Sequence, residues 1–298
     1  MINIINKSEK NTEDDKRMHQ FFLSIDVFDE ISDRKTGSGI QYFDIFLEKI
    51  KPIEYEGELF RARLVDFKKD LGKNKGFEQS GHYVYGYNEI ESGRPPEIIC
   101  KAGRMNSEWQ SYWYFADDPV TAMMEVQPTI RQGVSLAKYR TKHKVKIIDF
   151  SIYKNTKWEN MFDEKIIEKY GDNLKRAYEK IVWFFSKPYE ESKDYYISNL
   201  IRERCQELGT SDGIKYKSFY GNGNNIVVWN TDKEFEWIDS KLYMNYCCNN
   251  YFLSLSDEEN LDNNRGFGSK VNSITQEDIN VMKGRVLDQN KTINNKSD

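Results

Sequence analysis

The chain has 298 residues, of which 38% are hydrophobic and 31% are charged, so it has enough apolar material for one or two globular units. Its 44 basic and 48 acidic residues leave a formal charge of −4, a balance that does not favour a nucleic-acid partner. No stretch approaches the roughly 18 apolar residues of a membrane span, and the N-terminus lacks an apolar signal core, so we expect a cytoplasmic protein without a membrane partner.

The first elements that the sequence predicts are helices. Residues 1–16 are polar and charged, and we expect them to be loosely ordered. Bulky apolar residues at roughly helical spacing predict one helix over residues 18–31 and another over residues 42–50. We expect these two helices to form an N-terminal helical extension that packs on the main domain.

From residue 57 onward the sequence changes to short runs rich in β-forming residues. The alternating run GELFRARLVDF predicts a strand, and SYWYFA, VSLAKY and KVKIIDF predict three more. Asp118 followed by Pro119 is typical of a helix start, so residues 119–125 should form a short helix directly after the SYWYFA strand. The remaining expected elements are two longer helices, over residues 158–185 and 195–208, and a hairpin whose strands cover residues 214–218 and 226–230.

Strands interspersed with helices predict an α+β fold in which a mixed β-sheet has flanking helices. We assign the helical extension to residues 1–51, the main domain to residues 52–246 and a C-terminal extension to residues 247–298. Much of the C-terminal extension is rich in Asn, Asp, Ser, Lys and Gly, so we expect it to be largely flexible.

Metal chemistry has little support in the sequence. The four cysteines form no CxxC pair with a histidine at metal-binding spacing, and the three histidines, His19, His82 and His143, are far apart. The glycines of Gly221-Asn222-Gly223 lead into a predicted strand rather than a helix, so they do not form a dinucleotide-binding fingerprint. We therefore expect no metal cofactor and no Ser-His-Asp triad.

Polar residues interrupt several of the predicted strands and helices at positions where a core would prefer apolar side chains. They are Arg61, Arg63, Arg104, Tyr114, Glu125 and Ser218. Taken singly, an arginine or glutamate in a sheet protein is more often half of a surface ion pair. A lone Tyr114 is more often core packing, and a lone Ser218 is more often a turn hydroxyl. Their joint occurrence is what calls for a functional explanation.

Two blocks carry a resemblance to a known family. The stretches AGRMNSEWQSYWYFADDPVTAMMEVQP and YYISNLIRERCQELGTSDGIKYKSFYGNGNNIVVWN resemble the RES domain, with LFRARL as a weaker third block. RES proteins are similar in fold to ADP-ribosyltransferases, so the resemblance implies a split mixed sheet with NAD held in a cleft. Known members degrade NAD by hydrolysis or phosphorolysis, and many are toxins that a neighbouring antitoxin neutralises.

The resemblance also implies roles for individual residues. It assigns catalytic roles to Glu125, Arg104, Tyr114 and Ser218, and NAD contacts to Arg61, Arg63 and Asn199. A carboxylate such as Glu125 can stabilise the sugar cation formed when the nicotinamide–ribose bond breaks. The planar, permanently charged guanidinium groups of arginines suit the binding of the NAD pyrophosphate. Alternation puts Arg61 and Arg63 on one face, so either could contact the substrate. At Ser198-Asn199 the family has Thr-Gln, so the amide is shorter here.

The leading hypothesis is an NAD+-consuming enzyme, a glycohydrolase or a phosphorylase that uses inorganic phosphate as co-substrate, acting as a bacterial toxin or defence effector. One alternative is a mono-ADP-ribosyltransferase that modifies a macromolecule, and another is a non-catalytic RES-fold interaction module. A cognate antitoxin and a homodimer are further expected partners. The residues do not choose between hydrolysis, phosphorolysis and transfer, because the acceptor depends on what the cleft admits after nicotinamide leaves.

Overall fold

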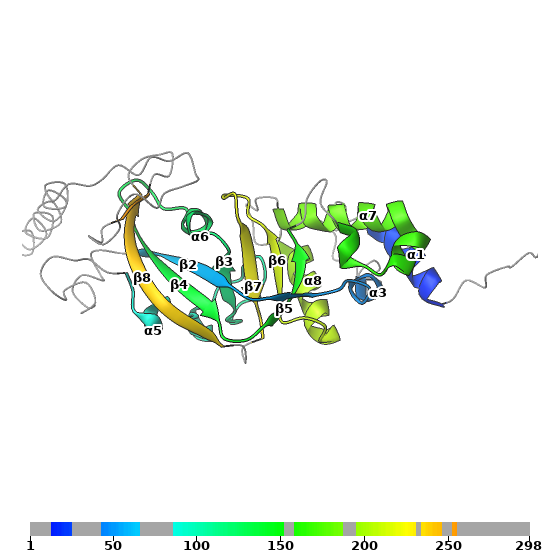
Figure 1. Cartoon of the computed structure of the whole chain (residues 1–298), viewed down its shortest axis with the longest axis horizontal. Helices are drawn as coiled ribbons and strands as arrows, with labels where there is room; N and C mark the ends of the chain where they lie inside the picture. The colour runs from blue at the N-terminus through cyan, green and yellow to red at the C-terminus, as the bar shows by residue number, and fades with distance from the viewer. Residues whose placement is uncertain are drawn as a thin grey trace, which may run out of the picture. The chain divides into compact units, whose positions relative to one another are not determined.

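The structure, a computed structural model, describes residues 13–25, 43–65, 86–151, 158–186, 195–230 and 234–245, together with the backbone of residues 252–254. Its elements are shown in Figure 1. The chain divides into two compact units. Unit 1 comprises Met1–Gly57, Arg94–Phe115 and Thr141–Glu234, and unit 2 comprises Glu58–Gly93, Ala116–Arg140 and Phe235–Asp298. The predicted boundaries at residues 51/52 and 246/247 stay predictions.

Unit 1 contains a mixed sheet. Its strands, in spatial order, are β1 (Ile53–Tyr55), β5 (Val145–Phe150), β6 (Gly213–Lys217), β7 (Asn224–Val228) and β3 (Trp113–Ala116). The last residue of β3, Ala116, is counted with unit 2. Strand β5 pairs parallel with β6, whereas β1 with β5 and β6 with β7 are antiparallel pairs. The parallel pair is typical of strands that are joined through helices, here α7 and α8.

Helices pack against the strands of unit 1. They are α1 (Glu13–Ile25), α3 (Phe43–Leu47), α7 (Glu164–Ser186) and α8 (Tyr196–Leu208), with short 3-10 helices at η3 (Glu97–Ile99) and η4 (Trp158–Met161). Helix α7 is kinked at Gly171, whose φ of 31° is non-helical. Helix α8 ends at Gly209, which has a left-handed φ of 63°.

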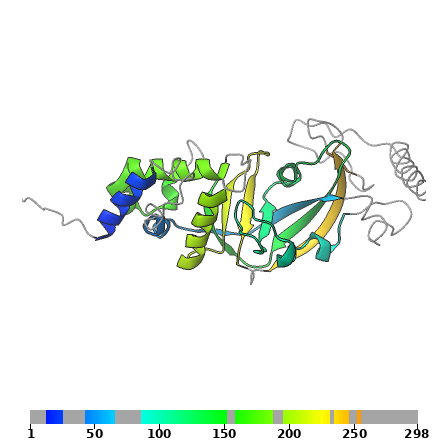
Figure 2. The same ribbon diagram turned by 180° about the vertical axis from the view of Figure 1, so that it is seen from behind.

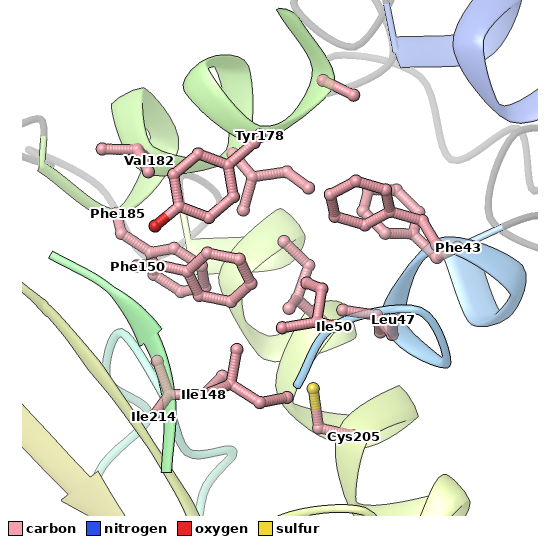
Figure 3. Close-up of a cluster of buried hydrophobic side chains, with 14 of the residues drawn as sticks. Phe43, Leu47, Ile50, Ile148, Phe150, Tyr178, Val182, Phe185, Cys205 and Ile214 are labelled. Atoms are coloured by element: carbon pink, nitrogen blue, oxygen red, sulfur yellow. The ribbon is translucent and has the colours of Figure 1, made fainter. Parts of the chain in front are cut away.

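The N-terminal helices are part of the core of unit 1. The buried residues of α1 are Met18, Phe21, Phe22 and Ile25, at the spacing of one helix face. The ring of Phe21 lies 5.2 Å from that of Phe43 and 4.8 Å from that of Phe46. Figure 3 shows α3 side chains packing in one cluster with those of β5, α7 and α8. Residues 13–16, expected to be loosely ordered, form the first turn of α1, so that part of the prediction is wrong.

The shared core gives a stability prediction. Phe21→Ala should lower the free energy of unfolding by about 3–5 kcal/mol, because the ring is fully buried and its removal leaves a cavity between α1 and α3. Leu23→Ala on the same helix is the control, since Leu23 is 55% exposed and should cost no more than about 0.5 kcal/mol. Urea titration followed by circular dichroism measures both. Equal midpoints would show that α1 contributes no core packing.

Unit 2 is built on an antiparallel sheet. Its strands are β2 (Glu58–Val65), β4 (Gly133–Thr141), β8 (Phe235–Asn245) and β9 (Phe252–Ser254), in that spatial order, and its helices are α5 (Glu89–Ser92) and α6 (Pro119–Glu125). Strands β2 and β4 pair along their length, with Arg61 opposite Ala137. Val134, Leu136 and Met123 belong to one apolar cluster beneath α6.

Helices α6 and α5 lie on opposite faces of β2. Helix α6 packs on the side where Phe60 and Ala62 contact its apolar cluster. Helix α5 lies on the side of Arg61 and Arg63, which bond to its C-terminal end. Figure 1 shows α6 above the strands and α5 below them, and Figure 2 shows the same arrangement from behind. This follows from the pleat, since successive side chains of a strand point to opposite faces.

The expected fold class is confirmed: the chain is α+β, with a mixed sheet and flanking helices. The helix after SYWYFA begins at Pro119 and ends at Glu125 as predicted. Among the described residues, no helix is long and apolar enough to cross a membrane.

Candidate active site

Arg104 is fixed between a helix end and an aromatic ring in unit 1. Its guanidinium donates a hydrogen bond to the carbonyl oxygen of Phe185, in the last turn of α7. Its Cζ atom lies 5.6 Å from the centroid of the Tyr216 ring on β6, which is cation–π distance. These two contacts orient the plane of the guanidinium, as recognition of a phosphate by a planar fork requires.

Helix α8 holds the loop that carries Arg104. The hydroxyl of Ser198 donates to the carbonyl oxygen of Arg104, and Nδ2 of Asn199 donates to the carbonyl oxygen of Gly103 at 2.9 Å. Position 103 has little room, since a Cβ there would lie 2.7 Å from Oδ1 of Asn106. The structure therefore places Asn199, predicted to contact NAD, in direct contact with the Arg104 loop.

Tyr114 meets the same loop from β3. Its hydroxyl donates to Oδ1 of Asn106 at 2.7 Å and accepts from the backbone N–H of Met105 at 3.1 Å. Burial raises the pKa of Tyr114 well above its usual value, so the phenol is neutral at physiological pH. Arg104, Tyr114 and Asn199 are thus brought together around residues 103–106, and the catalytic role assigned to Tyr114 stays a prediction.

Arg202, on α8, was not among the predicted site residues. It is only 1% exposed, and its guanidinium bonds to Oη of Tyr112 at 3.3 Å, to Oδ1 of Asn199 at 3.4 Å and to Oε1 of Glu203 at 2.8 Å. It thereby fixes the amide of Asn199 with its nitrogen toward Gly103. The sequence signal was available, because Arg202 lies four residues after Ser198 on the buried face of the predicted helix.

Ser218 caps the hairpin between β6 and β7. It is 5% exposed, and its Oγ accepts hydrogen bonds from the backbone N–H groups of Tyr220 at 3.1 Å and Gly221 at 2.8 Å. These are the contacts of a turn hydroxyl. Ser218 also lies two residues after Tyr216, the ring against which Arg104 is placed. The role in catalysis assigned to Ser218 stays a prediction.

Glu125 is the last residue of α6 in unit 2. The helix starts with Asp118, whose carboxylate accepts from the backbone N–H of Thr121 at 2.7 Å, and with Pro119 in its first turn. Thr121, Ala122 and Met123 are buried, which leaves the half-buried carboxylate of Glu125 at the end of the packed face. The local sequence therefore fixes the position of Glu125 through the cap and the apolar side of α6.

Arg61 and Arg63 hold the C-terminal end of α5. Arg61 donates to the carbonyl oxygen of Ser92 at 2.6 Å, and Arg63 donates to that of Gly93 at 2.5 Å. Such contacts satisfy carbonyl groups at a helix end. Burial lowers the pKa of Arg63, and it raises that of the neighbouring Tyr139 to about 12, an effect that both guanidinium charges oppose.

The structure does not bring the arginine pair and Glu125 to the same face of the sheet. Arg61 and Arg63 lie on the α5 side of β2, whereas α6, which carries Glu125, lies on the other side. Both arginines make equivalent carbonyl contacts, so geometry does not favour either as the NAD ligand. Within the described ranges, no group of three or more His, Cys, Asp or Glu side chains is arranged to hold a metal ion.

The strands and helices around these residues define an α+β protein with a mixed sheet. The chain belongs to the RES domain family, because a model of that family matches residues 80–242, a range that contains Arg104, Tyr114, Glu125, Asn199 and Ser218. Arg61 and Arg63 lie before the matched range. No curated protein matches the chain. The chain is similar to a chain of the crystal structure of the M. tuberculosis MbcT–MbcA toxin–antitoxin complex, with 11% identity, a TM-score of 0.36, and coverage of 74% of this chain and 90% of that chain.

Proposed function

We propose that this protein cleaves the nicotinamide–ribose bond of NAD+ and thereby depletes the NAD of the cell in which it acts. The observation that carries the proposal is membership of the RES domain family over a range that includes Arg104, Tyr114 and Glu125. Known members of the family degrade NAD. The described geometry is compatible with this, since Arg104 has an oriented guanidinium and Glu125 has a carboxylate at the end of a fixed helix.

In the proposed reaction, Glu125 and Arg104 have separate roles. The C–N bond between ribose and nicotinamide breaks, nicotinamide leaves as a neutral molecule with the bonding electrons, and the sugar carries the positive charge. Glu125 stabilises that charge in the transition state. Water then forms the new C–O bond and loses a proton, which gives ADP-ribose, or inorganic phosphate forms it and gives ADP-ribose 1″-phosphate. Arg104 binds the pyrophosphate.

Incubation of the purified chain with NAD+, with and without inorganic phosphate, tests the proposal by the release of nicotinamide. NAD+ labelled in its adenylate part separates the outcomes. Free ADP-ribose identifies hydrolysis, the 1″-phosphate identifies phosphorolysis, and label that stays on a macromolecule identifies transfer, the alternative function. No nicotinamide release under any of these conditions would overturn the proposal.

We also propose that the chain is the toxin of a toxin–antitoxin pair. Support comes from the family, many of whose members are neutralised by a neighbouring antitoxin. Induced expression of the full chain in a bacterium should lower cellular NAD before growth stops, and co-expression of the adjacent reading frame should restore both. Growth arrest with a constant NAD level would show that the toxicity does not come from NAD cleavage.

A further inference from the structure

A buried asparagine outside the family match holds the connection that follows Glu125. Residues 126–132, here called the 126–132 connection, join α6 to β4 in unit 2. Asn245, the last residue of β8, is 1% exposed and lies beyond residue 242, where the family match ends. Its side chain and its backbone both bond to the 126–132 connection.

The contacts of Asn245 are distributed along the connection. Its Nδ2 donates to the carbonyl oxygen of Pro128 at 2.7 Å and to that of Thr129 at 3.4 Å. Its backbone N–H donates to the carbonyl oxygen of Gln132 at 3.1 Å, and its own carbonyl oxygen accepts from the backbone N–H of Arg131 at 2.6 Å. One residue therefore bonds to four positions of the segment.

The connection is strained where it is held. Gln127 and Arg131 have φ angles of 45° and 64°, a region that side-chain-bearing residues rarely occupy. Such backbone persists only where the surrounding structure over-determines it. The N–H of Gln127 bonds back to the carbonyl oxygen of Met124 in α6 at 3.0 Å, and the N–H of Gln132 closes a turn on the carbonyl oxygen of Thr129 at 3.0 Å. The other described backbone bonds that hold the connection in its strained path come from Asn245.

Glu125 is attached directly to this segment. Val126 is the C-cap residue of α6, and Gln127 turns the chain out of the helix by its bond to the carbonyl oxygen of Met124. A change in the path of the connection therefore changes the last turn of α6. Misplacement of a reacting group by about 1 Å can cost about 10²-fold in rate.

We infer that Asn245 is a positioning residue for Glu125, and that β8 supplies it to the candidate active site; this inference rests on the proposed function. An amide suits the position, because its two N–H donors face two carbonyl oxygens. Aspartate has the same shape but presents only acceptors to them. Asn245→Asp therefore reverses the interaction with almost no change in volume, and Asn245→Ala removes it.

The test compares Asn245→Ala and Asn245→Asp with Leu242→Val. Leu242 is fully buried in the same strand, and its truncation weakens the packing of β8 without removing a bond to the connection. For the Asn245 variants we expect kcat for nicotinamide release to fall by about 10–100-fold with KM for NAD+ within about twofold. Leu242→Val should keep a wild-type kcat at a temperature where all variants are folded.

Hydrogen exchange supplies a readout that is independent of catalysis. Amides of residues 126–132 should exchange about tenfold faster in both Asn245 variants than in Leu242→Val. Unchanged exchange, or faster exchange with a wild-type kcat, would overturn the inference while the wild type still cleaves NAD+. A wild type that releases no nicotinamide would instead overturn the proposed function, and with it the catalytic part of the inference.

Discussion

Glu125→Gln should reduce kcat for nicotinamide release by about 10²–10³-fold, because an amide of the same shape cannot stabilise the positive charge that develops on the ribose. The free energy of unfolding should change by no more than about 0.5 kcal/mol, since the side chain is half-buried and lies at a helix C-terminus, where a negative charge is not favoured. Steady-state release of nicotinamide and urea titration measure the two quantities.

Glu58→Gln is the matched control for this variant. Glu58 belongs to the same unit and forms a partly exposed ion pair with Lys138 at 2.6 Å. Its neutralisation therefore changes the net charge equally without altering the candidate site. We expect wild-type kcat from Glu58→Gln, and loss of toxicity on expression only from Glu125→Gln. Equal activity of the two variants would show that another carboxylate carries the reaction.

Local signals in the sequence predicted most of the elements. Asp118-Pro119 placed the start of α6, and the carboxylate of Asp118 does cap it. The predicted end of the second long helix at residue 208 is also the end of α8, and Gly209 after it adopts the left-handed conformation. Such signals work because the residues nearby decide them: a cap, a proline and a positive φ angle need no distant partner.

Features that depend on distant partners could not be predicted in the same way. Strand β8 was missed, since FEWIDSKLYMN alternates weakly and is stabilised by pairing beside β4. The helices of residues 1–51 were expected to pack on the domain, yet the sequence did not show that Phe21 and Phe46 belong to the same core as α7 and α8. Both depend on contacts between residues far apart in the chain.

In the candidate site, too, features set by nearby residues were predicted, whereas features set by distant contacts were not. Alternation correctly placed Arg61 and Arg63 on one face of β2, but only the structure shows α5 on that face and α6 on the other. Arg202 was overlooked because a charged residue on a helix is usually solvated. Its burial against Tyr112 and Asn199 depends on how α8 packs. Asn245 lay outside every recognisable motif.

Arg104→Lys should lower kcat/KM for NAD+ by about 10²-fold, mostly through KM, because an ammonium keeps the charge but not the planar fork that pairs with phosphate oxygens. Lysine also cannot keep both the bond to the carbonyl oxygen of Phe185 and the cation–π contact of a guanidinium with the Tyr216 ring. Arg176→Lys, on the exposed side of α7, is the control and should retain wild-type kinetics.

A truncated substrate separates pyrophosphate binding by Arg104 from general damage to the site. Nicotinamide riboside has the same scissile bond as NAD+ but no phosphate. If Arg104 binds the pyrophosphate, Arg104→Lys should cleave the riboside within about threefold of the wild-type kcat/KM, because the lost interaction is absent from that substrate. An equal loss on both substrates would mean that Arg104 acts on the ribose or the nicotinamide, or that it holds the loop of residues 103–106 in place.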